Sequence, residues 1–173
     1  MKKINLKSYV RDIPDFPKKG IIFKDITTLL NDEKAFRATI DGLAEKYKNK
    51  GIDAVVAVEA RGFILGGALA NKLSAGFVPV RKKGKLPAET LSVTYDLEYG
   101  TDTLEIHKDA IKSGAKVLIV DDVLATGGTV KAVTNLIKQL NGKISGIAFL
   151  IELKFLKGKE KLKGYPVFSL IKY

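Results

Sequence analysis

Two adjacent acids stand between an apolar run and a glycine-rich loop in the segment Val117–Val130, which reads VLIVDDVLATGGTV. The run 117–120 predicts a buried strand, and the residues from Gly128 onward predict a helix. In such a strand–loop–helix unit, the loop 125–129 directs backbone N–H groups at one point beside the helix N-terminus, which favours negative charge. Its glycines allow close approach, and Thr126 and Thr129 add hydroxyl donors, so the loop predicts a phosphate site.

Other phosphate-binding motifs fit this sequence poorly. G-x-x-x-x-G-K-[ST] is absent, which argues against a P-loop NTPase, and no G-x-G-x-x-G follows a predicted strand, which argues against a dinucleotide site. The structural alternative is a strand that ends in solvated aspartates before a glycine-rich helix cap. The acid pair Asp121 and Asp122 lies beside an anion-binding loop, and this combination favours a sugar phosphate as the ligand. The loop would hold the phosphate, while the two acids accept hydrogen bonds from ring hydroxyls and face positive charge that develops at C1'.

Predicted helices and apolar strands alternate along the chain. Helices are expected at 32–50, 63–72 and 128–140, strands at 53–60, 77–80, 116–120 and 144–153, and a β-hairpin at 90–106 with its turn at Tyr99–Gly100. Apolar strands joined through helices indicate an α/β fold with a parallel sheet covered on both faces. Ligands of such sheets bind beyond the carboxyl ends of the strands. One rim is therefore expected to carry 59–62, 81–85, 121–129 and the region of Glu152.

Composition narrows the class of protein further. The 173 residues suffice for one domain with a substantial core, and the absence of cysteine excludes disulfides and thiolate zinc sites. The N-terminus has no apolar stretch typical of a signal peptide, and no apolar run approaches the roughly 20 residues of a membrane span, so we expect a cytoplasmic protein without a membrane partner. The net charge of +11 is compatible with an anionic small substrate or with nucleic acid.

The segment VLIVDDVLATGGT resembles the phosphoribosyl-diphosphate motif of the type I phosphoribosyltransferases. The rest of the chain resembles the adenine-specific members of that family nearly end to end. The matching segments are VRDIPDFPKKGIIFKDIT at 10–27, VEARGF at 58–63, VPVRKKGKLP at 78–87, YDLEYGTDTLEIH at 95–107 and IELKFLKG at 151–158. The resemblance implies a single domain with a central parallel sheet flanked by helices, a small N-terminal hood at about residues 1–30, and a β-hairpin flap at 90–106.

The resemblance also implies a reaction, in which adenine and phosphoribosyl diphosphate give AMP and diphosphate with Mg²⁺ held mainly by the substrate. Asp121 and Asp122 would hold the ribose, and the 5'-phosphate would lie on Ala125, Thr126, Gly127, Gly128 and Thr129. Diphosphate would be held by Glu59, Ala60, Arg61, Gly62, Arg81, Lys82 and Lys85. Because a basic loop of this kind can reach a neighbouring subunit, we expect a homodimer. A familiar variant has serine in place of Ala60, so one hydroxyl donor is missing here.

The flap and the hood would complete the site. Glu98 matches the flap glutamate that contacts N7 of the base, where it could accept the proton that adenine loses, and Tyr99 would pack over the ligand. In the hood, Phe23 would stack on the purine opposite Leu153, and the backbone of Ile22 would pair with N1 and the exocyclic amine. A common form of the family has arginine in place of Lys24, which removes a forked donor.

Two other functions remain open at this point. One is a phosphoribosyltransferase for a 6-oxo purine, because recognition through backbone groups is hard to read from side chains. The other is a regulator on the same fold that binds nucleic acid and senses the sugar phosphate without catalysis. The sequence shows no helix-turn-helix extension, and it keeps Glu98 and Arg61, which a regulator would not need. We therefore expect an enzyme with small-molecule substrates and no nucleic-acid partner.

Overall fold

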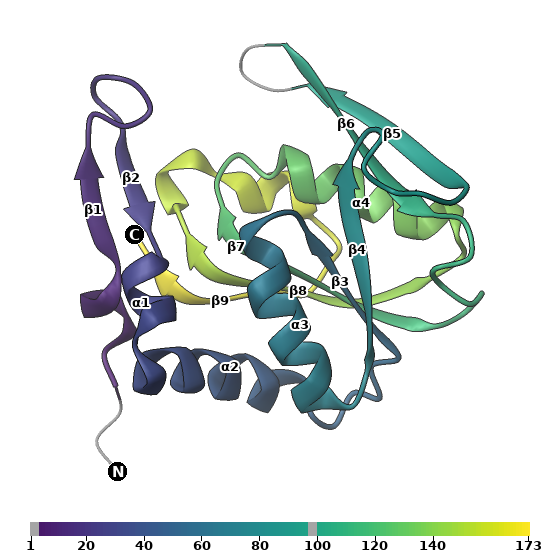
Figure 1. Cartoon of the computed structure of the whole chain (residues 1–173), viewed down its shortest axis with the longest axis horizontal. Helices are drawn as coiled ribbons and strands as arrows, with labels where there is room; N and C mark the ends of the chain where they lie inside the picture. Colours follow the sequence, from purple (N-terminus) through teal and green to yellow (C-terminus); the bar gives the residue numbers. More distant parts are fainter. Residues whose placement is uncertain (1–3, 97–99) are drawn as a thin grey trace. The chain divides into compact units, whose positions relative to one another are not determined.

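The computed structural model describes residues 4–96 and 100–173 of the chain (Figure 1). These residues divide into two compact units, Met1–Gly42 and Leu43–Tyr173. Helix α2 (Glu33–Tyr47) runs across the division.

A two-stranded antiparallel sheet and two short helices make up most of the N-terminal unit. Its elements are the 3₁₀ turn η1 (Leu6–Tyr9), strands β1 (Arg11–Pro14) and β2 (Ile22–Asp25), and helix α1 (Thr27–Asn31). At the end of the sheet, the Arg11 guanidinium lies 2.6 Å from Asp25, which also accepts the backbone N–H of Thr27 at 2.9 Å. That backbone hydrogen bond and Arg11 lower the pKa of Asp25 from 3.8 to about 2.

Asp25→Asn is therefore expected to destabilise the protein at pH 7. The lowered pKa of Asp25 corresponds to a shift of about 3.8 − 2 = 1.8, or up to about 2 kcal/mol. Because the folded-state pKa lies below the ordinary value, this stabilisation is complete above about pH 4 and is lost as the pH falls towards 2. Urea unfolding of wild type and Asp25→Asn at pH 7 and at pH 3 measures the free energy that the Asp25 carboxylate contributes at each pH. An equal difference in unfolding free energy at both pH values would contradict the assignment.

The second unit is built on a seven-stranded sheet in the order β5-β6-β4-β3-β7-β8-β9. The strands are β3 (Ala54–Val58), β4 (Gly76–Lys82), β5 (Thr90–Asp96), β6 (Thr101–His107), β7 (Lys116–Leu124), β8 (Lys143–Glu152) and β9 (Val167–Lys172). Strands β4, β3, β7, β8 and β9 are parallel, while β5 and β6 form an antiparallel hairpin that joins the edge at β4. The predicted parallel sheet and hairpin are confirmed. Strand β9 was not predicted from the sequence.

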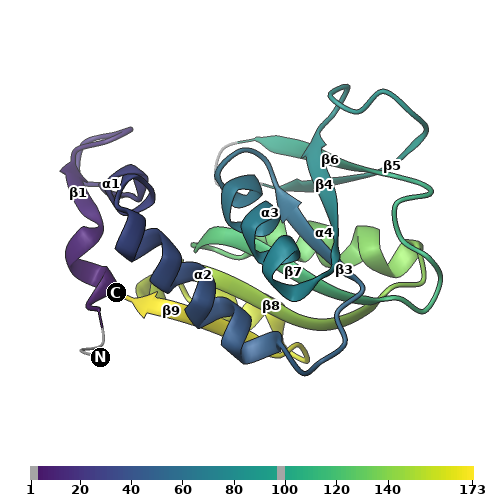
Figure 2. The ribbon, with the colours of Figure 1, turned by 60° about the horizontal axis from the view of Figure 1, so that its bottom comes forward.

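Helices α3 (Arg61–Leu73) and α4 (Gly128–Gln139) cover opposite faces of this sheet (Figures 1 and 2). Alternate strand residues such as Val56 and Ile119 share one apolar cluster with Val133 and Leu136 of α4. Helix α3 packs on the other face of the sheet, where the residues between these point. A Cβ on Gly66 of α3 would lie 2.6 Å from the Cβ of Ala57 in β3. All five residues of β3 are buried, as the continuous apolar sequence indicates.

The 3₁₀ turns η2 (Lys154–Leu156) and η3 (Gly158–Leu162) connect β8 to β9. The parallel strands β3, β4, β7 and β8 bring their carboxyl ends to one edge of the sheet. Most of the predicted site residues follow those ends.

Candidate functional site

A pocket of about 500 Å³ opens at the carboxyl edge of the sheet. It brings together seven residues that the sequence predicts for the site: Glu59, Ala60, Arg61, Lys82, Asp121, Asp122 and Thr129. Its other lining residues are Val58, Tyr95, Asp102 and Leu104. Tyr95 and Asp102 lie in the segment 95–107 that resembles the family, but neither was predicted as a site residue. They are paired across β5 and β6, and strand pairing, which the sequence does not show locally, decides which side chains of the hairpin line the pocket.

The two acids lie inside β7, not beyond it. We expected the strand to end at Val120, but its pairing with β8 continues through Asp121 and Val123 to Leu124. The reason is that Phe149 and Ile151 of β8 offer continuous partners, so the ladder extends past the charged residues. The acids are therefore fixed by the sheet and do not sit on a loop.

Arg61 compensates the charge of one of these acids. Its Nε atom lies 2.7 Å from Oδ2 of Asp122, whose side chain is 9% exposed. Asp121 is placed differently, since its Oδ1 accepts the backbone N–H of Asp122 at 2.9 Å. Gly62 permits this packing, because a Cβ there would lie 2.9 Å from Oδ1 of Asp121.

Burial raises the pKa of both acids above the ordinary range. For Asp121 burial and the neighbouring charge of Asp122 act together, so its pKa lies well above the usual value. For Asp122 burial also dominates, but Arg61 opposes it and limits the rise in pKa. Asp121 is partly buried by surface exposure, whereas Asp122 is buried. A carboxylate in such surroundings with little compensation gains from any ligand that brings hydroxyl donors or positive charge to it.

The predicted phosphate loop 125–129 leads from β7 into α4. Gly127 has φ of 80° and ψ of 0°, a left-handed conformation that favours glycine, and α4 begins at the next residue. Thr129 lies in the first turn of that helix, where its Oγ1 is 3.4 Å from the hydroxyl of Tyr95. The first turn leaves its backbone N–H groups without intrahelical partners, as an anion site requires.

Glu59 lines the pocket and is bound on both carboxylate oxygens by the basic segment. Its Oε1 accepts the backbone N–H of Lys82 at 2.6 Å, and its Oε2 lies 3.1 Å from the guanidinium of Arg81. Although burial raises the pKa of Glu59, these two partners outweigh it and lower that pKa. Glu59 thus supports the basic segment from within the pocket lining, and its role towards diphosphate stays a prediction.

The basic segment 81–85 forms an ordered turn at the end of β4. Arg81 donates to the carbonyl of Lys85 at 3.2 Å, and the N–H of Gly84 donates to Oε2 of Glu105 at 2.9 Å. Lys82 lines the pocket and pairs with Asp102 at 3.1 Å, which raises the pKa of Lys82. Lys85 is not among the lining residues of the pocket.

The flap glutamate and tyrosine, Glu98 and Tyr99, fall outside the described residues. The strands that precede and follow them in the sequence, β5 and β6, pair from Thr90↔His107 to Asp96↔Thr101. Tyr95 reaches from β5 towards the phosphate loop, and burial raises the pKa of its hydroxyl.

The residues expected to bind the base belong to different units. Ile22, Phe23 and Lys24 form β2 of the N-terminal unit, where Ile22 is 55% exposed and the Phe23 ring packs edge-on against Phe16 with centroids 5.2 Å apart. The ammonium of Lys24 lies 2.7 Å from Asp12 across the same sheet. Leu153 follows β8 in the second unit and is half-buried.

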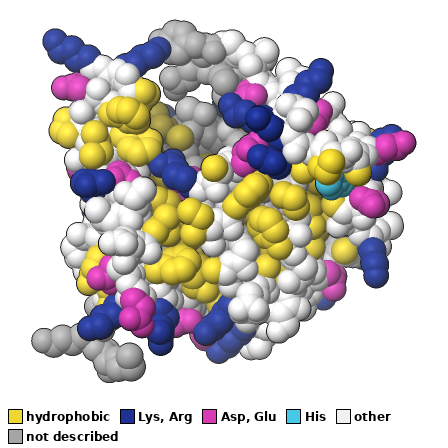
Figure 3. Space-filling view, viewed as in Figure 1, with side chains coloured by type: hydrophobic (Ala, Val, Ile, Leu, Met, Phe, Trp, Pro, Cys, Tyr) yellow, Lys and Arg dark blue, Asp and Glu magenta, His cyan; other side chains and the backbone are white. Residues whose placement is uncertain are grey.

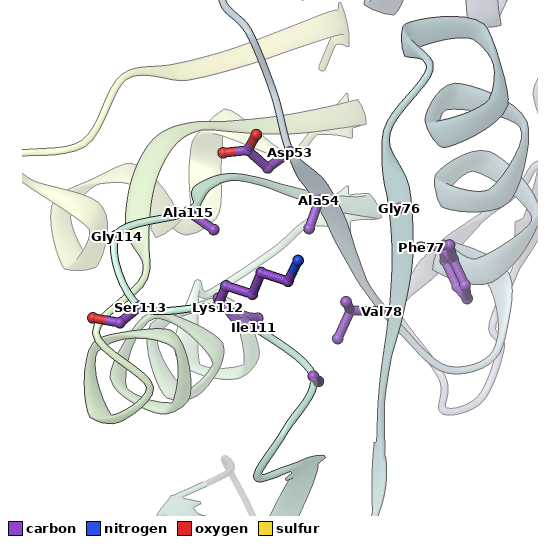
Figure 4. A pocket seen from close by; sticks show the side chains of 11 residues that line it. Asp53, Ala54, Gly76, Phe77, Val78, Ile111, Lys112, Ser113, Gly114 and Ala115 are labelled. Atoms are coloured by element: carbon purple, nitrogen blue, oxygen red, sulfur yellow. The ribbon is translucent and has the colours of Figure 1, made fainter.

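A second cavity, of about 650 Å³, lies at the amino ends of β3 and β4 (Figure 4). Asp53 and Lys112 line it together with Phe77 and Val78, and Asp53 accepts the backbone N–H of Lys116 at 2.7 Å. None of the residues predicted for the site contributes to it. Because ligands of parallel sheets bind at the opposite edge, we assign the functional site to the pocket at the carboxyl edge.

The carboxylates of that pocket offer few free positions to a metal ion. Within residues 4–96 and 100–173, no group of three or more His, Cys, Asp or Glu side chains could hold a metal on its own. Mg²⁺ usually binds through one or two carboxylates together with substrate phosphates and water. Asp121 and Asp122 therefore fit an ion that arrives with a phosphorylated substrate.

The chain matches the family model described as the phosphoribosyl transferase domain over residues 26–171. It is 63% identical to an adenine phosphoribosyltransferase of Geobacter metallireducens over 97% of this chain and 98% of that protein. The crystal structure of adenine phosphoribosyltransferase from Thermoanaerobacter pseudethanolicus superposes with a TM-score of 0.94 at 58% identity, covering 97% of this chain and 98% of that one.

A third relative comes from Saccharomyces cerevisiae. Its adenine phosphoribosyltransferase, solved in complex with an imino-altritol bisphosphate and adenine, has a TM-score of 0.90 at 44% identity over 95% of each chain. The fold and the pocket thus define a nucleotide-forming class of enzyme, and this chain belongs to the phosphoribosyltransferase family.

In the described part of the chain, no helix is long and apolar enough to cross a membrane.

Proposed function

We propose that this protein transfers the 5-phosphoribosyl group from phosphoribosyl diphosphate to adenine, forming AMP and diphosphate in the cytoplasm. The observation that carries the proposal is that one pocket brings together an acid pair, an arginine and the first turn of α4: Asp121, Asp122, Arg61 and Thr129. Relatives with 58–63% identity over nearly the whole chain are adenine phosphoribosyltransferases, which supports adenine as the acceptor.

The loop 125–129 would hold the 5'-phosphate on its backbone N–H groups. Asp121 and Asp122 would accept hydrogen bonds from the ribose hydroxyls, and their charge would stabilise C1' as the bond to diphosphate lengthens. Arg61 lies against Asp122 at 2.7 Å, so it would be at hand to neutralise charge on the leaving group. When bound, Mg²⁺ would neutralise part of the diphosphate charge. Arg61 and Lys82 would neutralise more of it.

Bond formation between N9 of adenine and C1' releases a proton from the base. We propose Glu98 on the flap as its acceptor, with Tyr99 packing over the ligand. Phe23 and the backbone of Ile22, in the hood at about residues 1–30 of the single catalytic domain, would contact the base. Leu153 is proposed as a further contact to the base. A backbone carbonyl facing the 6-position selects an amino group over a 6-oxo group, which is also an acceptor.

An exposed apolar area on α3 and β4 supports a homodimer. Ile64 is 47% exposed and Phe77 is 39% exposed, and the rings of Phe63 and Phe77 pack edge-on at 5.6 Å. Apolar side chains gather over these two elements, directly beside a group of basic and acidic ones (Figure 3). Light scattering of the purified protein measures the oligomeric state.

Diphosphate release with phosphoribosyl diphosphate and Mg²⁺, across adenine, hypoxanthine, guanine and xanthine, tests the proposed function. We expect release with adenine alone. Release with a 6-oxo purine would keep the sugar-phosphate site but overturn the assignment of Ile22. Binding of the sugar phosphate with no release for any base would favour the regulator, as would tight, salt-dependent binding of RNA or DNA.

Glu98→Gln is expected to lower kcat by about 100-fold while leaving the KM for phosphoribosyl diphosphate within a few-fold, since glutamine keeps the size but accepts no proton. Steady-state kinetics with adenine measures both constants. Glu89→Gln, an exposed acid that precedes β5, is the control. An unchanged kcat in Glu98→Gln would remove Glu98 from the mechanism.

A further inference from the structure

An ion pair between a buried carboxylate and a partly exposed lysine lies beside the phosphate loop and has no part in the mechanism described above. Glu152 is the last residue of β8, and its side chain is only 7% exposed. Its Oε2 lies 2.9 Å from the ammonium of Lys159, in η3. A carboxylate this deeply buried needs a partner, because an uncompensated buried charge is costly.

The same short segment presses its backbone against the phosphate loop. A Cβ on Gly127 would lie 2.5 Å from the carbonyl oxygen of Gly158, and a Cβ on Gly158 would collide with the carbonyl oxygen of Ala125. Gly158 immediately precedes Lys159, so the ion pair holds the residue that touches the loop. No side chain separates the two backbones, and a shift of Gly158 is therefore transmitted to the loop directly.

Glu152 also stands close to the start of the phosphate loop along the sheet. Glu152 is the register partner of Leu124 on β7, and Leu124 immediately precedes the loop residue Ala125. The backbone N–H of Leu153, the residue after Glu152, donates to the carbonyl of Leu124 at 2.9 Å. A negative charge here would repel a phosphate held by the loop, and the low polarity of the surroundings would strengthen that repulsion. Lys159 cancels this charge.

We propose that Lys159 is a positioning residue for the 5'-phosphate: its ion pair with Glu152 holds Gly158 against the phosphate loop and neutralises the buried carboxylate beside it. The proposal rests on the proposed function, which places a sugar phosphate on that loop. Lys159 acts through Glu152 and Gly158 and needs no contact with the substrate.

Lys159→Met tests the positioning role, because methionine keeps much of the apolar length and removes the charge. We expect its Kd for phosphoribosyl diphosphate with Mg²⁺, measured by calorimetry without adenine, to rise about tenfold. The KM for that substrate should rise in parallel, with kcat changed less than threefold. Lys159→Arg should bind within about twofold of wild type. Lys161→Met, which removes an equal charge from an exposed position of the same turn, should bind as wild type does.

The double variant Glu152→Gln with Lys159→Met separates charge from packing. It removes the buried carboxylate together with its partner, so it restores neutrality but not the ion pair. We expect it to recover the share of the affinity that Lys159→Met loses through uncompensated charge, and the remaining loss measures how far the ion pair holds Gly158 in place. Glu152→Gln alone should bind at least as well as the double variant, and it tests the charge effect even where Lys159→Met does not fold. Thermal melts establish that each variant is folded.

Unchanged affinity in folded Lys159→Met would overturn the proposal, and so would a double variant that binds no better than Lys159→Met. These results are distinct from failure of the proposed function. Wild type that binds phosphoribosyl diphosphate but releases no diphosphate with adenine would refute the function and leave the positioning role standing. Wild type that does not bind this sugar phosphate would overturn both.

Discussion

Asp121→Asn should lose at least about 100-fold in kcat/KM and yet be more stable than wild type at neutral pH. The loss of activity follows from removing one of the two charges that face C1' when it becomes electron-poor. The gain in stability follows from removing a carboxylate whose ionisation in the folded state is opposed by burial and by Asp122. We expect roughly 1 kcal/mol, or a rise in Tm of about 2–4 °C, a modest figure because the pocket admits water.

The sign of the pH dependence follows from the raised pKa of Asp121. Such a group stabilises the folded state at low pH and loses that contribution as the pH rises through its folded-state pKa. Wild type and Asp121→Asn should therefore have nearly equal stability below the ordinary value of 3.8, and the variant should gain an advantage as the pH rises above it. Thermal melts between pH 3.5 and 8 measure this difference.

Asp122→Asn is the matched control for the stability effect. Asp122 pairs with Arg61 at 2.7 Å, so its removal leaves a partly buried guanidinium without that partner. We expect a comparable loss of activity but little or no gain in Tm. Equal stabilisation by both variants would show that the two acids are equivalent, contrary to their different partners.

Gly127→Ala is expected to cost roughly 2–4 kcal/mol of stability and to raise the KM for phosphoribosyl diphosphate at least tenfold. Two effects combine at this position. Alanine is strained at a φ of 80°, and its Cβ would lie 2.5 Å from the carbonyl oxygen of Gly158. The clashing atom belongs to the backbone and not to a flexible side chain, so the phosphate loop itself must move. Its N–H groups then no longer point at one position.

Gly128→Ala provides a control one residue away. A Cβ there would meet only the carbonyl oxygen of Asp96 at 3.5 Å and the ring of Tyr95 at 3.7 Å, which are ordinary contacts. Gly128 is also the first residue of α4, where alanine has the higher helix propensity. Chemical denaturation should show Gly128→Ala close to wild type in stability. If the two variants lost stability equally, the left-handed φ and the contact with Gly158 would not be the cause.

The local sequence determined those parts of the site that depend on short-range geometry. The segment 117–130 specifies a buried strand, two acids and a glycine-rich turn into a helix, because apolar run, loop and cap all lie within fourteen residues. Its resemblance to a known family assigned the chemistry. The alternation of helices and strands likewise predicted the parallel sheet, since strand burial on both faces leaves a continuous apolar signature.

Tertiary structure alone decided how charges are paired around that site. Glu59 reads as an anion-loop residue in the sequence, yet it supports Arg81 and Lys82, twenty-two and twenty-three positions away. Asp102 and Tyr95 enter the pocket from the hairpin, and Lys159 reaches Glu152 only because η3 folds back behind the phosphate loop. The physical reason is that a side chain's partner is set by strand order and register. These depend on packing across the whole sheet and leave no local pattern.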